Sequence, residues 1–141
     1  ANAHTLLSAA SWRDAELQEL ARSVLLPFTS YHGENIEVHG DPVRIPPKVA
    51  QSLALVFHEL ATNAVKHGAL TSPQGRVCLE WKLTEPGRSL EILWRETGGA
   101  SVKPPKRRGL GLTIIDTALS GEGAKIDCRF EACGVTCAIL I

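Results

Sequence analysis

The order of two hydrophobic periodicities along the chain restricts its fold more than any other feature. Apolar residues with helical spacing occupy 12–26 and then 46–66, whereas alternating residues follow at 75–83, 90–96, 124–130 and 135–141. A short alternating stretch at 35–39 separates the two helical segments. The chain is mainly helical segments followed by strands, with little β-α-β alternation. The pattern predicts an α+β two-layer sandwich of helices and an antiparallel sheet.

Proline and glycine mark the ends of these elements. Pro27 ends the first helical segment, and Pro46-Pro47 stands in the first turn of the long helix. Gly68 is predicted to be the C-cap of that helix. The turn sequence at 85–88 lies between two alternating runs and predicts a hairpin, and a further helix is expected at 109–119.

Size and charge exclude several classes of protein. The 141 residues are sufficient for one domain with a substantial core. Fifteen Lys+Arg balance fifteen Asp+Glu, so the chain lacks the basic excess typical of nucleic-acid binding. Its longest apolar runs are about five residues, and a membrane-spanning helix needs ~20. No signal peptide is recognisable, and a chain that begins ANAHTLL without Met is expected to be part of a longer protein.

The four cysteines carry little functional signal. Cys78, Cys128, Cys133 and Cys137 form no C-x-x-C pair, and the last three lie in strand-like surroundings. We expect them to be reduced and to pack as small apolar side chains. A reducing, cytoplasmic location is the corresponding expectation.

The second helical segment carries a polar stripe. Glu59, Asn63 and Lys66 are spaced i, i+4, i+7, so at 3.6 residues per turn they lie on one side of the helix. Carboxylate and carboxamide oxygens suit a hard cation such as Mg²⁺, and an ammonium suits a phosphate. A solvated helix surface with a Glu–Lys pair is the structural alternative.

Other motifs fail on single residues. His58-Glu59 begins like the H-E-x-x-H zinc motif, but Thr62 stands where the second histidine is required. A Walker A sequence is absent, and Gly109-Leu110-Gly111 lacks the third glycine of a dinucleotide fingerprint, since Ile114 occupies that place.

Two glycine-rich elements follow the hairpin. Glu96-Thr97-Gly98-Gly99 places an acid at a strand end beside glycines, which suits hydrogen bonding to an exocyclic amine and the approach of a flat ring. Arg107-Arg108-Gly109-Leu110-Gly111 opens the expected helix, where free amides and arginines suit phosphate. Each element alone is also compatible with an ordinary turn or with local packing.

In this order, the motifs resemble the ATP-binding catalytic domain of sensor histidine kinases in the Bergerat (GHKL) superfamily, and specifically the HWE subgroup. The N-box is similar to 57–70 (FHELATNAVKHGAL), the W-x-E motif to Trp94-Arg95-Glu96, and the glycine-rich box to 108–112. The resemblance covers nearly the whole chain. It implies the Bergerat fold, with helices on one face of a mixed, mainly antiparallel sheet.

The resemblance also implies a role for each matching residue. Asn63 would ligate the Mg²⁺ that bridges the ATP phosphates, and Glu59 would orient or deprotonate the accepting histidine or activate water. His58 is a second candidate catalytic residue, with local packing as its alternative role. Glu96 would bind the adenine amino group, where most histidine kinases use Asp. The other implied nucleotide-binding residues are Lys66, His67, Gly98, Gly99, Arg107, Arg108, Gly109, Leu110, Gly111 and Leu112.

The phosphoacceptor of the family is a histidine followed by Arg and, shortly after, Asn. None of the five histidines has these neighbours: His4, His32, His39, His58 and His67. We therefore interpret 1–141 as a single catalytic domain, with 1–30 as a helical flank that follows a separate dimerisation domain bearing the acceptor. ATP, that dimerisation domain and a response regulator are the expected partners, without nucleic acid or membrane contact by this segment.

Two other functions remain compatible with the same fold. One is a nucleotide-binding regulatory or interaction module, suggested by Glu96 and by the short lid at 100–108. The other is a GHKL serine kinase or ATPase, against which the W-x-E motif argues.

Overall fold

The computed structural model describes residues 15–29, 35–84, 89–99, 125–131 and 134–141. The elements, in chain order, are β1 (Ala15–Glu16), α2 (Leu17–Leu25), the 3₁₀ turn η1 (Leu26–Phe28), β2 (Ile36–Gly40), β3 (Arg44–Ile45), α3 (Pro47–His67), the 3₁₀ turn η2 (Ala69–Thr71), β4 (Arg76–Thr84), β5 (Ser89–Thr97), β6 (Lys125–Glu131) and β7 (Gly134–Leu140).

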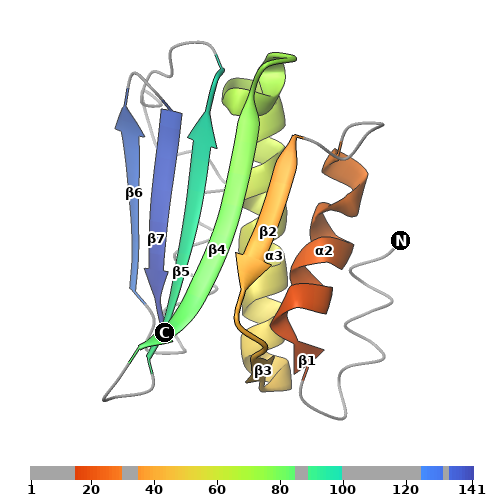
Figure 1. Ribbon diagram of the computed structural model, residues 1–141, viewed down its shortest axis with the longest axis vertical. Coiled ribbons are helices and arrows are strands. Elements are labelled where there is room, and N and C mark those ends of the chain that lie inside the picture. Colours follow the sequence, from red (N-terminus) through yellow and green to blue (C-terminus); the bar gives the residue numbers. More distant parts are fainter. Residues whose placement is uncertain (1–14, 30–34, 85–88, 100–124, 132–133) are drawn as a thin grey trace.

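Helices and sheet form two layers, as Figure 1 shows. The five-stranded sheet has the order β2-β4-β5-β7-β6, and a second small sheet pairs β1 with β3. The β2–β4 pair is parallel, and the other pairs of the main sheet are antiparallel. Helices α2 and α3 both lie on one face of this sheet (Figure 1). The prediction of an α+β two-layer sandwich with a mixed, mainly antiparallel sheet is confirmed.

Helix α3 has the ends that its sequence predicts. Pro47 is the first helical residue, where its missing N–H costs no intrahelical hydrogen bond. Gly68 is the C-cap, and its N–H donates to Ala64 O at 3.1 Å. The buried side of the helix is formed by small and aliphatic residues with one aromatic: Ala50, Leu53, Ala54, Val56, Phe57, Leu60, Ala61 and Ala64.

Helix α2 begins five residues later than the apolar spacing from Trp12 predicts, at Leu17. Ala15 and Glu16 instead pair with Ile45 and Arg44 in an antiparallel strand. The Glu16 side chain then caps the helix by accepting from the amides of Gln18 and Glu19, each at 3.2 Å.

One hydrophobic core joins both helices to the sheet. Its largest fully buried side chains include Trp94 on β5, Phe57 on α3 and Leu79 on β4. Burying a side chain of this kind stabilises the fold by roughly 1.5–3 kcal/mol. The helices and the inner face of β5 are therefore held in a fixed relation, which positions the polar residues at their edges.

The cysteine prediction is wrong for two residues. Cys128 and Cys137 face each other across the antiparallel β6–β7 pair, with their Cα atoms 4.0 Å apart, and they form a disulfide. The register of the two strands brings the sulfurs together, which spacing along the sequence does not reveal. Cys78 is a free thiol, and burial raises its pKa above the ordinary value.

Some predicted elements lie outside the described residues. These are the hairpin turn at 85–88, the lid at 100–108 and the helix at 109–119. Across the described part of the chain, no helix combines the length and apolar character needed to cross a membrane.

Candidate functional site

The polar stripe of α3 lies along the border of the buried side of the helix. Glu59 and Asn63 are half-buried, and Lys66 is exposed one turn further on. The Glu59 side chain is only 20% exposed, so the stripe adjoins the core more closely than an ordinary solvated helix surface does. The structure thus keeps the carboxylate, the carboxamide and the ammonium in a row.

Two side chains of the stripe make no polar contact in the described part of the chain. Within the described ranges, neither Asn63 nor Lys66 uses its side chain in a hydrogen bond or an ion pair. The Glu59–Lys66 pair expected of a purely structural helix surface is therefore not formed. Glu59 Oε1 lies 3.9 Å from His58 Nδ1, which is at the limit of an ion pair.

A cation at Asn63 would be held by few protein ligands. In the described segments no group of three or more His, Cys, Asp or Glu residues could hold a metal ion. Mg²⁺ commonly keeps several waters and binds one or two protein oxygens together with substrate phosphates. The carboxamide oxygen of Asn63 fits that mode of binding and does not fit a structural zinc or calcium site.

His58 makes a packing contact with the turn that follows α2. Its ring lies edge-to-face with Phe28 of η1, with the ring centroids 5.6 Å apart. The side chain is 54% exposed, and its backbone carbonyl accepts from the Thr62 hydroxyl at 2.8 Å. This contact supports the packing alternative for His58, and its catalytic role stays a prediction.

Glu96 is the buried acid of the site. It is 4% exposed, and both carboxylate oxygens accept hydrogen bonds. Oε1 accepts from the Ala69 amide at 3.0 Å, and Oε2 accepts from the Trp94 indole Nε1–H at 2.8 Å. Burial raises the pKa of Glu96, and the two hydrogen bonds oppose that rise because they favour the ionised form.

Glycines at the end of α3 and at the end of β5 are closely packed near this carboxylate. A Cβ on Gly68 would collide with Glu96 Oε1, so the C-cap of α3 must be glycine for the acid to occupy its position. Gly98 has φ +75°, a left-handed conformation that glycine adopts without strain. A Cβ on Gly99 would lie 2.6 Å from Ala69 Cα, which is closer than side chains approach. Gly99 therefore lets the end of β5 pack directly against η2.

The structure brings together two groups of predicted residues that are far apart in the sequence. The end of α3, with Lys66, His67 and Gly68, adjoins Glu96 through the Ala69 amide. Gly99 packs against Ala69 of the same turn, and Gly98 lies beside Gln74. The predicted phosphate-binding residues lie outside the described ranges: Arg107, Arg108, Gly109, Leu110, Gly111 and Leu112.

Sequence reasoning did not identify two hydrogen-bond partners of Glu96 as site residues, the Trp94 indole and the Ala69 amide. The Trp94 side chain shares the inner face of β5 with Glu96 because the two residues are two positions apart in a strand, and this i, i+2 spacing was the available signal. The Ala69 amide is 27 residues from Glu96 in the sequence, and no local pattern indicates its contact.

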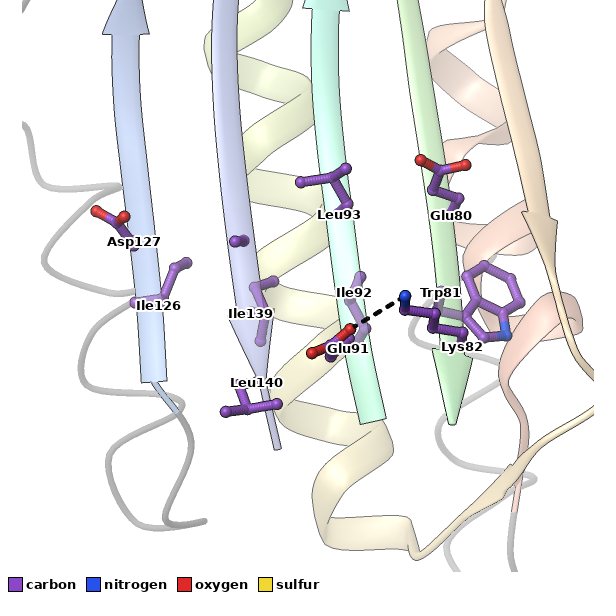
Figure 2. A pocket seen from close by; sticks show the side chains of 11 residues that line it. Glu80, Trp81, Lys82, Glu91, Ile92, Leu93, Ile126, Asp127, Ile139 and Leu140 are labelled. Carbon is purple, nitrogen blue, oxygen red and sulfur yellow. Dashed lines mark ion pairs between the residues drawn. The ribbon is translucent and has the colours of Figure 1, made fainter. Parts of the chain in front are cut away.

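A separate groove of about 940 Å³ lies over strands β4 to β7 (Figure 2). Lys82 and Glu91 form an ion pair at 3.7 Å within it, and Leu93 and Leu140 contribute apolar surface. None of the predicted nucleotide-binding residues lines it. Exposed ion pairs of this kind contribute about 0–1 kcal/mol to stability.

Comparison with known proteins links the chain to histidine kinases. The sequence model of the family described as HWE histidine kinase matches residues 1–42. A blue-light-activated histidine kinase of Rhizobium johnstonii is 38% identical over 98% of this chain, and the chain spans 43% of that relative's length.

Solved structures share the fold. The histidine kinase domain of the Erythrobacter litoralis EL346 blue-light-activated histidine kinase superposes with a TM-score of 0.71 at 23% identity, covering 89% of this chain and 58% of that one. The catalytic domain of histidine kinase ThkA gives a TM-score of 0.66 at 20% identity, covering 91% of this chain and 94% of that one. At these identities the likeness establishes the fold, which is that of histidine kinase catalytic domains.

Proposed function

We propose that the chain is an ATP- and Mg²⁺-binding catalytic domain of the HWE histidine kinase type, which transfers the γ-phosphate to a histidine on a separate dimerisation domain. One observation carries the proposal. The buried Glu96 carboxylate accepts a hydrogen bond from the Ala69 amide, two residues past the end of α3. This contact joins an acid suited to a nucleobase amine to a helix whose polar stripe suits phosphate and metal.

The base and the phosphates of a nucleotide would contact different residues along this site. Glu96 would accept from the adenine amino group, since each carboxylate oxygen has a lone pair left after one hydrogen bond. Gly98 and Gly99 would border the adenine pocket, and their missing Cβ atoms make room for the backbone of Gln74 and Ala69 beside it. Asn63 lies five residues before Gly68, or about 7.5 Å along the helix axis, and would face the phosphates.

Phosphoryl transfer needs positioning and charge neutralisation more than covalent help from the protein. Mg²⁺, held by the Asn63 oxygen and the phosphates, would supply charge neutralisation when bound. The Lys66 ammonium, which has no ion-pair partner in the described residues, would add positive charge to the phosphate end. The half-buried Glu59 carboxylate would orient the acceptor imidazole and take its proton as the P–N bond forms and ADP leaves.

The remaining proposals concern the surroundings of the domain. Residues 1–141 would form a single catalytic domain, with its acceptor histidine on a dimerisation domain and a response regulator downstream. Arg107, Arg108 and the glycines at 109 and 111 would hold phosphates in the nucleotide complex. We place the domain in the cytoplasm, where ATP is available. The Cys128–Cys137 disulfide would be an exception in that compartment.

Nucleotide titration tests the proposal directly. The binding of a non-hydrolysable ATP analogue is measured by calorimetry. It is expected to be about tenfold tighter with Mg²⁺ than with EDTA, because Asn63 and the phosphates would hold the metal together. The matching GTP analogue is the control, since its base has no exocyclic amine at position 6 and should bind more weakly. Equal binding of the two bases with no effect of Mg²⁺ would contradict the assignment.

A further inference from the structure

The indole of Trp94 has a contact that core packing alone does not require. Its ring is fully buried on the inner face of β5, and its Nε1–H donates to Glu96 Oε2 at 2.8 Å. The other carboxylate oxygen is held at 3.0 Å by the Ala69 amide. The carboxylate is thus fixed from the sheet on one side and from the end of α3 on the other.

A glutamate at this position needs such fixing. Its side chain has three rotatable bonds, and unrestrained rotamers would spread the acceptor atoms over several positions. Recognition of an amine requires an acceptor oxygen within about 3 Å of one place. Gly68, whose missing Cβ leaves room for Oε1, and the indole N–H together restrict the carboxylate to one orientation.

We propose that Trp94 is a positioning residue for base recognition, which holds Glu96 through its indole N–H so that the carboxylate selects a nucleobase carrying an exocyclic amine. The inference rests on the proposed nucleotide-binding function. It concerns selectivity between bases and is separable from the stability that the buried ring provides.

Trp81 offers a matched control in the same sheet. It is also buried, 4% exposed, and its Nε1–H donates to the Asp41 carbonyl at 2.9 Å. Replacing either tryptophan by phenylalanine removes one indole hydrogen bond and a similar volume from the core. Trp94→Phe removes a bond to Glu96, whereas Trp81→Phe leaves that carboxylate untouched.

The experiment compares ATP with purine riboside triphosphate, which lacks the 6-amino group. The wild-type chain is expected to prefer ATP by about tenfold or more, the range expected for a hydrogen bond to a charged group. Trp94→Phe should reduce that ratio at least fivefold, and Trp81→Phe should leave it unchanged even if both variants lower the melting temperature equally. If the two variants had equal preferences for ATP over the purine nucleotide, the inference about Trp94 would be overturned, and the proposed function would still stand. Failure of the wild-type chain to bind either nucleotide would overturn the proposed function, and the inference with it.

A measurement on the wild-type chain tests the inference without requiring that the variants fold. The chain has three tryptophans, so its indole N–H signals can be followed individually by NMR. Addition of a non-hydrolysable ATP analogue is expected to shift the Trp94 indole signal and leave that of Trp81 in place. The purine analogue should shift the Trp94 signal much less. A Trp94 signal that ignores bound adenine nucleotide would overturn the inference.

Discussion

Asn63→Ala is expected to lower the rate of phosphoryl transfer by a factor on the order of 10² or more, and to abolish the effect of Mg²⁺ on nucleotide binding. A metal ligand supplies several kcal/mol of charge stabilisation in the transition state, and each ~1.4 kcal/mol is a tenfold change in rate. The Asn63 carbonyl oxygen has no other hydrogen-bond partner in the described residues, so its removal should act on the metal. The rate is measured in the full-length kinase with labelled ATP, and binding by calorimetry.

The control for this variant is Gln51→Ala on the same helix. Gln51 is an exposed carboxamide about 18 Å nearer the start of α3, so its loss removes an amide without touching the proposed site. Both substitutions place alanine, the best helix former, in α3 and should change the free energy of unfolding by no more than about 0.5 kcal/mol. Wild-type transfer and Mg²⁺ dependence in Asn63→Ala would show that Asn63 is not the metal ligand.

Glu96→Gln is expected to destabilise the fold by about 1–3 kcal/mol and to remove the preference for adenine, although the two side chains have nearly the same shape. The carboxylate offers an acceptor oxygen to each of two donors, the Ala69 amide and the Trp94 indole. A carboxamide has one oxygen and one NH₂ group, so one donor would face another donor in a buried place. Urea unfolding measures the loss in stability, and nucleotide titration measures the loss in selectivity.

Glu80→Gln on the neighbouring strand is the matched control. Glu80 pairs with Arg95 at 2.8 Å, but its side chain is 41% exposed, so its substitution should cost less than about 1 kcal/mol of stability.

The pH dependence of stability adds a second test for Glu96. Because burial raises its pKa in the folded state, its contribution to stability is fully present below the ordinary value of 4.5 and is lost as pH rises through the raised pKa. Glu96→Gln should lack this part of the pH dependence. Equal stability of Glu96→Gln and wild type would contradict the role given to the carboxylate.

Local signals predict the ends of α3 and the β4–β5 hairpin because each depends on residues nearby. Pro47 suits the first turn of a helix, Gly68 ends it, and alternation on both sides of 85–88 indicates paired strands. The polar stripe was also predictable, since helical spacing alone puts Glu59, Asn63 and Lys66 on one side.

Features that depend on tertiary contacts could not be predicted in the same way. The start of α2 is set by pairing of Ala15 with Ile45, thirty residues away in the sequence. The Cys128–Cys137 bond follows from strand register, and the contact of Glu96 with the Ala69 amide spans 27 residues. Each of these contacts joins two elements whose relative placement depends on packing of the core. No local pattern in the sequence indicates such a contact.

We propose that the chain delivers the γ-phosphate of ATP to a histidine of a separate dimerisation domain. The most direct measurement mixes the chain with γ-labelled ATP, Mg²⁺ and a purified histidine kinase dimerisation domain that carries the acceptor histidine. We predict Mg²⁺-dependent, acid-labile label on that histidine, lost in the variant lacking the acceptor and in Asn63→Ala. Nucleotide binding without any label would indicate a regulatory module, and acid-stable label on serine would indicate a serine kinase. Either result would contradict the account.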